Sequence, residues 1–337
     1  MRTALLFAIP LLWSLMGCSE TATPIVSQQL QTQALGQTVQ ITSYGEDPAH
    51  LLQAMHTAEE DLHYVLGMSH PWEPGPLGRT NELFSLTGAF SAAPSGMLML
   101  EQARELYQLS DGWFNPALGQ LQRLWGLQQD DLSTANPATQ EAIDQVLQTA
   151  PSLTQIHVEG IRMSSSNAML RLDYGPFAFG YALDTARQRL REAGISQAQI
   201  ISGNALVLLG EPLTPFALGH YPGVQLKLLA NESVFTVAIA DRHYWHNDTL
   251  IHPFIHPHNG QPVRGLASVT VLDSHGTARA AALAHALLVA GEEQLPALAT
   301  RMGVARYLLQ HEDGTLLASH EMLDRLQTEQ PVSVHGQ

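Results

Sequence analysis

Cys18 is the only cysteine among the 337 residues of this chain. The chain can therefore form no internal disulfide, so its folded part must be stabilised by the burial of apolar side chains. A chain of this length can bury a large core. We therefore expect a body that is stabilised by its core rather than a small disulfide-linked scaffold.

The residues before Cys18 have the features of an export signal. A positively charged start leads into an apolar run over 4–13. The run is too short to span a membrane as a mature helix, and Pro10 interrupts it. Residues 15–18 resemble the lipobox of bacterial lipoproteins. We predict a signal peptide over 1–17 and a lipid on Cys18; an ordinary signal peptide with a chance cysteine is the alternative.

The predicted lipid places the protein on the periplasmic side of a bacterial membrane, inner or outer. Residues 18–35 are rich in Ser, Thr, Gln and Ala and predict a flexible tether. A folded domain is predicted over 36–325, followed by a C-terminal tail over 326–337. We find no other apolar run that is long enough to cross a bilayer.

The chain is acidic, with 16 Lys and Arg against 31 Asp and Glu and a formal net charge of −15. Such a chain is a poor ligand for the phosphate backbone, so we expect no nucleic-acid partner. The acidic residues are spread along the sequence rather than gathered in a tail. The charge therefore indicates solubility and little more.

Helices predominate in the first half of the sequence and short strands in the second. Apolar spacing and turn residues predict helices over 48–67, 95–110, 182–193 and 277–290, and another that begins at Asn136-Pro137. Asp47 is the predicted N-cap of the helix over 48–67. Strands are predicted over 200–201, 205–209, 224–229, 233–240 and 267–272, and a hairpin over 305–310 and 315–319. This order predicts an α+β fold of mostly antiparallel sheet, as a single body with two lobes.

Three segments carry residues suited to chemistry. Residues 111–126 hold two tryptophans between glycine breaks, which could bind a planar ring or anchor a loop. Residues 172–184 read as a strand, a glycine turn and a helix start, where backbone N–H groups can bind an anion; a purely structural turn is the alternative. Residues 243–285 hold seven of the 16 histidines, which suit metal binding or acid–base chemistry, or simply a polar loop.

These segments resemble those of the FAD:protein FMN transferases, the ApbE family of periplasmic lipoproteins. Residues 111–126 resemble the family's tryptophan-glycine segment, and 172–184 its glycine-rich segment before a helix. Residues 255–263 resemble its Pro-Thr-Gly loop, and 277–291 its alanine-rich helix. Order and spacing agree from about residue 35 to residue 320. The resemblance implies an ApbE-like α+β fold.

The resemblance also implies an activity: binding FAD and transferring its FMN half to a threonine hydroxyl of a target flavoprotein in the periplasm, with release of AMP. It implies His252 or His256 as the catalytic base. The cofactor-binding residues that it implies are Trp72, Trp113, Asp173, Gly175, Ala178, Gly180, Tyr181, Asp184, Gly203 and Asn204.

The family usually holds Mg²⁺ with an Asp and a Thr one helical turn apart and with a backbone carbonyl. In this chain the Asp position is Ala281 and the Thr position is His285, while the carbonyl position is Ala178. Mg²⁺ prefers oxygen ligands, so these positions depart from its chemistry. The family's lysine before Gly180 is Phe179, and the second glycine of its pair is Pro176. The usual magnesium ligands are therefore absent.

Three functions remain open on the sequence. The chain could be an active, diverged transferase whose metal site is rebuilt from His285 with Asp173 or Asp273. It could instead bind flavin or a partner protein without catalysis. The third function is a periplasmic Zn²⁺ or Cu²⁺ site built from the histidines His243, His246, His256, His258 and His285.

Overall fold

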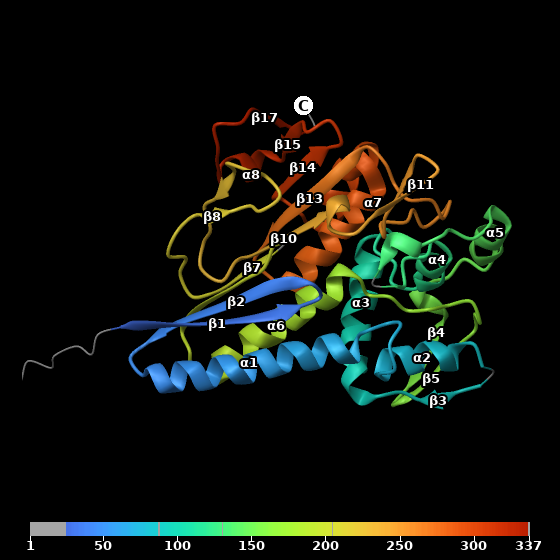
Figure 1. The fold of residues 1–337 in the computed structure, drawn as a ribbon, viewed down its shortest axis with the longest axis horizontal. Helices are drawn as coiled ribbons and strands as arrows, with labels where there is room; N and C mark the ends of the chain where they lie inside the picture. Colours follow the sequence, from blue (N-terminus) through green and yellow to red (C-terminus); the bar gives the residue numbers. More distant parts are fainter. Residues whose placement is uncertain (1–24, 87, 130, 204, 336–337) are drawn as a thin grey trace, which may run out of the picture.

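The computed structural model describes residues 25–335, except 87, 130 and 204. Its largest element is a sheet of nine strands in which every neighbouring pair is antiparallel except the last (Figure 1). In spatial order the strands are β1 (Val26–Ala34), β2 (Gln37–Gly45), β6 (Gln197–Ile201), β7 (Ala205–Leu209), β10 (Ser233–Ala238), β13 (Leu266–Asp273), β14 (Tyr307–His311), β15 (Leu316–Ala318) and β17 (Val332–Val334).

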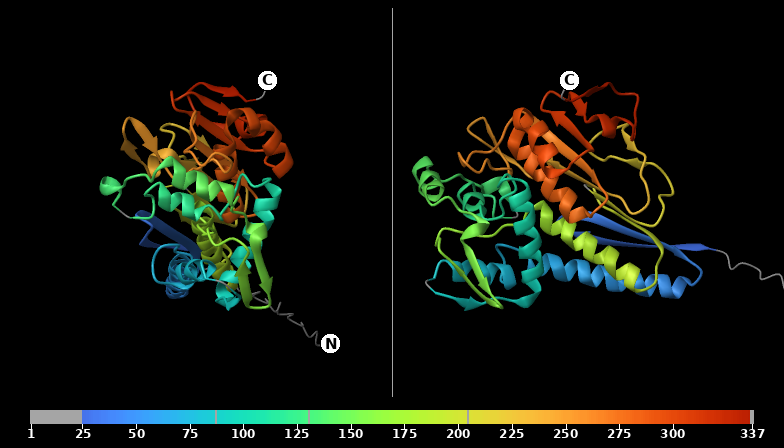
Figure 2. Two further views of the ribbon diagram at one scale, coloured as in Figure 1. Left: turned by 90° about the vertical axis from the view of Figure 1, so that its right-hand side faces the viewer. Right: turned by 180° about the vertical axis from the view of Figure 1, so that it is seen from behind.

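Three long helices cover one face of this sheet. Figure 2 shows α1 (Pro48–Met68), α6 (Pro176–Glu192) and α7 (Thr277–Met302) side by side across it, in blue, yellow-green and orange. Strand β7 is buried along its whole length, because alternate side chains enter two cores. Val207 packs in the core beneath the helices, and Leu208 packs in a second core on the opposite face.

The second core is closed by short elements: β8 (Phe216–Ala217), β9 (Gln225–Leu226), α8 (His320–Leu323) and β16 (Leu326–Gln327). A smaller lobe lies at one end of α1 and α6 (Figure 1). It contains α2 (Pro76–Phe84), β3 (Phe90–Ser91), α3 (Met97–Leu109), α4 (Gly119–Leu124), α5 (Gln140–Gln148), β4 (Ile156–Glu159) and β5 (Arg162–Ser165). The hairpin of β11 (Tyr244–His246) and β12 (Thr249–Ile251) contributes to a third core with α4 and α5.

These elements confirm the predicted α+β class with mostly antiparallel sheet. Helix α1 begins where it was predicted, because the side chain of Asp47 accepts hydrogen bonds from the N–H groups of Ala49 and His50. The predicted helix over 277–290 also ends as expected, since Gly291 has a positive φ of 73° and interrupts α7.

Two predicted boundaries were wrong. The tether over 18–35 was placed too far along the chain, because Val26–Ala34 form strand β1 and pair with β2 along its full length. The tail over 326–337 was also misplaced, since β16 pairs with β9 and β17 pairs with β15. In both segments, backbone hydrogen bonds to a neighbouring strand order residues whose composition alone predicts a flexible segment.

Two predicted helix starts were also wrong. The third helix begins at Gln140, with Thr139 as N-cap, rather than at Asn136. The fourth begins at Pro176, six residues before the predicted start, because Pro at the first helical position is compatible with helix geometry. Within the described residues, no helix is long and apolar enough to cross a membrane.

Candidate functional site

A large cleft opens where the main sheet meets the smaller lobe, and its volume is about 1400 Å³ including its open mouth. It is bordered by the turn between β1 and β2, the end of α1, the start of α6 and strand β10. The polar, charged and tryptophan side chains that line it are Gln37, Ser69, His70, Trp72, Gln122, Gln128, Asp173, Thr236, Asp241 and Arg242. Four of the predicted cofactor residues line this cleft: Trp72, Asp173, Gly175 and Ala178.

The start of α6 forms one wall of the cleft. Gly175 has φ 51° and ψ −134°, a conformation that favours glycine, and its N–H donates to Oδ1 of Asp173 at 3.0 Å. Burial raises the pKa of Asp173 above its usual value. The turn therefore holds a carboxyl group at the cleft wall whose ionised form is disfavoured.

The predicted anion site at this helix start lacks free donors. Pro176 has no N–H, the N–H of Phe177 donates to Tyr174 O at 3.2 Å, and that of Ala178 donates to Gly175 O at 3.1 Å. An anion-binding helix start needs N–H groups that are free to point at the ligand. In this chain those groups bond back to the preceding turn, so the positive charge for an anion must come from side chains.

Three glutamines leave buried polar atoms unpartnered at the cleft. Among the described residues, Oε1 of Gln37, Gln122 and Gln128 is buried without a hydrogen-bond partner, and all three residues line the cleft. An unsatisfied buried polar atom costs about 1–3 kcal/mol. A ligand with several N–H or O–H donors would satisfy these atoms, whereas an apolar ligand would not.

His70 is held in one tautomer by the loop after α1. Its Nδ1 lies 3.3 Å from the N–H nitrogen of Trp72 and 3.0 Å from that of Glu73, and it accepts from both. A neutral imidazole that accepts at Nδ1 carries its proton on Nε2. Since His70 lines the cleft, its Nε2–H is available there as a donor, without a partner in the described part of the chain.

Arg242 and Trp72 supply the cation and the ring of the cleft. The Nη2 group of Arg242 donates to the carbonyls of Leu127 at 3.0 Å and Gln129 at 2.6 Å, which fixes the guanidinium at the cleft wall. Arg242 is the one Lys or Arg that lines the cleft among the described residues. The guanidinium of Arg171 lies 5.2 Å from the centre of the Trp72 ring, a cation–π distance that orients this ring.

Trp113 and His256 lie outside the cleft and pack against each other. Their ring centres are 5.2 Å apart, and His258 completes the aromatic cluster at 5.8 Å from Trp113. The Nδ1 atom of His256 accepts from the N–H of His258 at 3.2 Å. Trp113, in the first of the three segments, thus meets the histidine loop, and these three rings anchor a loop rather than line the cleft.

His252 is also outside the cleft, with only 1% of its surface exposed. Its Nε2 lies 2.9 Å from Val263 O and its Nδ1 accepts from Phe254 N–H at 3.3 Å, so both ring nitrogens are engaged. Burial lowers the pKa of His252 to about 4. This geometry gives His252 a structural role and corrects the prediction that it acts as a base.

Gly180 and Asp184 join α6 to α7 instead of binding a cofactor. A Cβ on Gly180 would lie 2.7 Å from Thr277 O, so only glycine permits this approach of the two helices. The carboxylate of Asp184 accepts from the N–H groups of Thr277 at 3.0 Å and Ala278 at 2.8 Å. It therefore caps α7, and Arg187 pairs with it at 3.0 Å.

The remaining predicted cofactor residues have mixed positions. Tyr181 packs its ring 6.1 Å from that of Phe177, beside the core rather than in the cleft. A Cβ on Gly203 would lie 3.6 Å from Oε1 of Gln37, so Gly203 lies beside the cleft. Asn204 and Cys18 are outside the described residues.

The predicted magnesium positions do not fit Mg²⁺. Ala281 is completely buried and offers a methyl group. His285 is half-buried next to Phe254, which lines the cleft, with their ring centres 5.4 Å apart. Its Nδ1 has no partner, and burial lowers its pKa to about 4. Ala178 lies in the first turn of α6, where a backbone carbonyl bonds to the helix itself. No side-chain oxygen is present at these positions, and Mg²⁺ requires such ligands.

Two alternative metal sites are also contradicted. Asp273, which could rebuild the site with His285, is instead paired with Arg279. Across residues 25–335, apart from the three gaps, no group of three or more His, Cys, Asp or Glu side chains is placed to hold a metal ion. The predicted Zn²⁺ or Cu²⁺ cluster is therefore wrong: His256 and His258 pack against Trp113, whereas His285 packs against Phe114 and Phe254.

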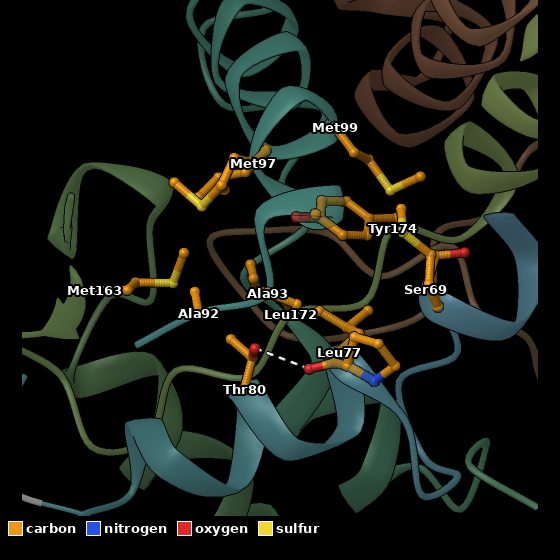
Figure 3. Close-up of a pocket in the computed structure, with 14 residues that line it drawn as sticks. Ser69, Leu77, Thr80, Ala92, Ala93, Met97, Met99, Met163, Leu172 and Tyr174 are labelled. Carbon is orange, nitrogen blue, oxygen red and sulfur yellow. Dashed lines mark hydrogen bonds between the residues drawn. The ribbon is translucent and has the colours of Figure 1, made fainter. Parts of the chain in front are cut away.

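A second, smaller pocket of about 390 Å³ including its open mouth lies next to the cleft, and Ser69 lines both. Figure 3 shows the side chains of Met97, Met99 and Met163 around it. The hydroxyl of Thr80 donates to Pro76 O at 2.9 Å and so is already bonded. The cavity is almost entirely apolar and does not suit a charged cofactor.

The comparisons with known proteins identify the family of this chain. The model of the ApbE family matches residues 35–308. The chain belongs to the ApbE family. This confirms the resemblance seen in the sequence.

Two curated relatives are named FAD:protein FMN transferase. One, from Rhodobacter capsulatus, is 31% identical over 301 residues, covering 87% of this chain and 57% of that protein. Another, from Treponema pallidum, is 26% identical over 254 residues, covering 68% of each. This chain thus spans little more than half the length of the R. capsulatus protein.

Solved structures of the family have the same fold. The ApbE protein of Thermotoga maritima superposes with a TM-score of 0.77 at 21% identity, over 89% of this chain and 99% of that one. The apo flavinyl transferase ApbE of Pseudomonas stutzeri gives 0.74 at 22% identity, over 88% and 94%. The flavin transferase ApbE of Vibrio cholerae gives 0.71 at 21% identity, over 90% and 100%.

The sequence did not single out the glutamines, His70 or Arg242 as site residues. Glutamine has no motif of its own, and the three glutamines come from separate segments that only the fold brings together. His70 lies in a weakly matching early segment, next to Trp72, which the sequence did predict. The signal that could have found it is the His-Pro-Trp sequence at the end of a helix.

Proposed function

We propose that this chain binds FAD in the cleft and acts as a FAD:protein FMN transferase on a periplasmic flavoprotein. In this reaction the oxygen of a threonine hydroxyl on the target bonds to the phosphorus on the FMN side of the pyrophosphate. The bond from that phosphorus to the oxygen bridging to AMP breaks, AMP leaves, and the hydroxyl proton is lost. The family and the names of the curated relatives support this assignment.

The observation that carries the flavin assignment is the set of unpartnered glutamine oxygens beside Trp72 and Arg242. Flavin adenine dinucleotide has N–H groups and hydroxyls for Gln37, Gln122 and Gln128. It has a flat ring for Trp72 and an anionic pyrophosphate for the cation. Few other metabolites are long enough to fill a cleft of this size and also carry hydrogen-bond donors, a flat ring system and two negative charges.

A second function, flavin binding without transfer, is favoured by the residues at the magnesium positions. Ala281 is a buried methyl group, and His285 is a half-buried imidazole next to Phe254. Phosphoryl transfer usually relies on a metal ion to neutralise the developing charge. A family member without oxygen ligands for that ion could keep the binding site and lose the reaction.

One assay separates the two functions. The full chain is mixed with FAD, with and without Mg²⁺, and with an acceptor flavoprotein domain that carries the target threonine. Covalent flavin on the acceptor, together with AMP release, supports the transferase. FAD binding with no covalent flavin supports binding alone, and no FAD binding contradicts both. An acceptor whose threonine is replaced by valine is the matched control.

We also propose that the chain is exported and anchored by lipid on Cys18, as the sequence of its first 18 residues predicts. In a bacterial host, the full chain should incorporate labelled palmitate and sediment with membranes. Cys18→Ser should abolish both signals while export is retained. Labelling that persists in Cys18→Ser would contradict the proposal.

A further inference from the structure

The cleft needs positive charge that the usual metal positions do not provide. FAD carries two negative charges on its pyrophosphate, and the cleft already contains the carboxyl groups of Asp173 and Asp241. The magnesium positions offer no side-chain oxygen, and the N–H groups at the start of α6 are bonded to the chain itself. An anion bound in this cleft must therefore be neutralised by other groups.

Arg242 is placed to supply that charge. Its Nη2 is held by two backbone carbonyls, which leaves Nη1 and Nε without a partner among the described residues. A guanidinium fixed on one side presents the other side of its fork to a phosphate with little further loss of entropy. Arg242 also lies close enough to Asp173 to favour the charged form of that carboxyl.

His70 supplies a neutral donor next to this cation. Its Nδ1 is fixed as an acceptor by the N–H groups of Trp72 and Glu73, so the cleft-facing atom is Nε2–H. His70 and Arg242 both line the cleft, as Asp173 does. The two donors come from different segments that border the cleft, the loop after α1 and the segment after β10.

We infer that Arg242 and the Nε2–H of His70 bind the pyrophosphate of FAD in place of the metal, so that FAD binding does not depend on Mg²⁺. This inference rests on the proposed function and goes beyond it, because it names the groups that hold the phosphates. It also separates this chain from relatives that keep oxygen ligands at the metal positions.

The test is FAD affinity of the full chain, measured by flavin fluorescence quenching in EDTA and again with excess Mg²⁺. We expect the two dissociation constants to agree within about twofold. A tightening of about tenfold or more with Mg²⁺ would overturn the inference while leaving the proposed function intact. Absence of FAD binding in both conditions would overturn the proposed function itself.

Two variants test the named donors. Arg242→Gln should weaken FAD binding by about tenfold or more, because a charge-assisted hydrogen bond is lost. His70→Asn keeps an acceptor for Trp72 and Glu73 but removes the Nε2–H, and it should weaken FAD binding by about fivefold. The matched controls Arg79→Gln and His157→Asn change exposed residues outside the cleft and should bind FAD as the wild type does.

Riboflavin distinguishes phosphate binding from a general loosening of the cleft. It has the ring and the ribityl hydroxyls of FAD but no phosphate. In both variants we expect riboflavin affinity to change by less than about twofold. Equal losses for riboflavin and FAD would show that His70 and Arg242 only support the loops, and the inference would then be wrong.

Discussion

Single residues decide what this cleft can and cannot bind. The aromatic rings around His285 keep its imidazole neutral, because a charged imidazole between Phe114 and Phe254 would have no partner. Its Nδ1 has no hydrogen bond at all in the described chain. His285 is thus a polar side chain among apolar ones, and its unpartnered Nδ1 should lower the free energy of unfolding.

His285→Leu should stabilise the protein and reduce its sensitivity to acid. Burial lowers the pKa of His285 to about 4, below the value of about 6.5 in an unfolded chain, so the unfolded state binds more protons between these values. Stability is therefore lost as the pH falls from about 6.5 toward about 4. From pH 7 to pH 5 we expect His285 to account for about 2 kcal/mol of the lost unfolding free energy.

Urea unfolding at pH 7 and pH 5 measures this difference. His285→Leu should be more stable than the wild type at pH 7 by about 1 kcal/mol or more, since an unsatisfied polar atom is removed. The difference in unfolding free energy between the two proteins should be larger at pH 5. His252, which is also held neutral by burial, is present in both proteins and cancels. Parallel pH dependences of the two proteins would contradict the assignment.

At the scale of elements, the close packing of α6 against α7 positions the cleft wall. Gly180 permits the contact, and Asp184 caps the first turn of α7. Because α6 begins at the cleft and α7 crosses the sheet, a shift between the two helices would move Asp173 and Gly175 relative to β10. Gly180 and Asp184, which this chain shares with the family pattern, therefore hold α6 and α7 in position and do not contact a ligand.

Gly180→Ala should destabilise the protein by about 1–3 kcal/mol. Its Cβ would lie 2.7 Å from Thr277 O and 2.8 Å from the Cα of Ala278, so backbone would have to move. Gly67→Ala is the matched control, because Gly67 also lies in a helix but has no atom within 4 Å of its Cβ. The control should be neutral or stabilised by about 0.4–1 kcal/mol in thermal unfolding. Equal losses in both variants would contradict the contact.

The elements also show what local sequence can reveal. Helix α1 was predictable because Asp47 caps it and its apolar residues recur at helical spacing. Strand β1 was not, because its glutamines, serine and threonine have the composition of a linker. The strand is formed by its pairing with β2 and lies at the edge of the sheet, where few apolar side chains are needed.

For the whole molecule, the site is assembled from segments far apart in the chain. Trp72, Asp173, Gly175 and Ala178 were predictable because they lie within recognisable segments. Gln37 is the first residue of β2, and Gln122 and Gln128 flank the end of α4. Nothing local marks these glutamines, because their role comes from the missing hydrogen bonds that only the folded chain reveals.

FAD should stabilise the whole fold by binding between its lobes. A ligand at 100 times its dissociation constant adds about 2.7 kcal/mol to the free energy of unfolding if it does not bind the unfolded chain. For a protein of this size we expect FAD to raise Tm by several degrees, in a concentration-dependent way. Differential scanning fluorimetry with AMP as the comparison ligand measures the shift, and an unchanged Tm at saturating FAD would contradict binding.

Strand β1 has a consequence for where the protein can work. Eight peptide steps separate Cys18 from Val26, the first residue of the strand. A fully stretched chain of that length reaches about 30 Å at most. Under the proposal that Cys18 carries lipid, the folded body stays within a few nanometres of the bilayer. The proposed target flavoprotein would then have to present its threonine close to the same membrane, as an integral or surface-bound protein does.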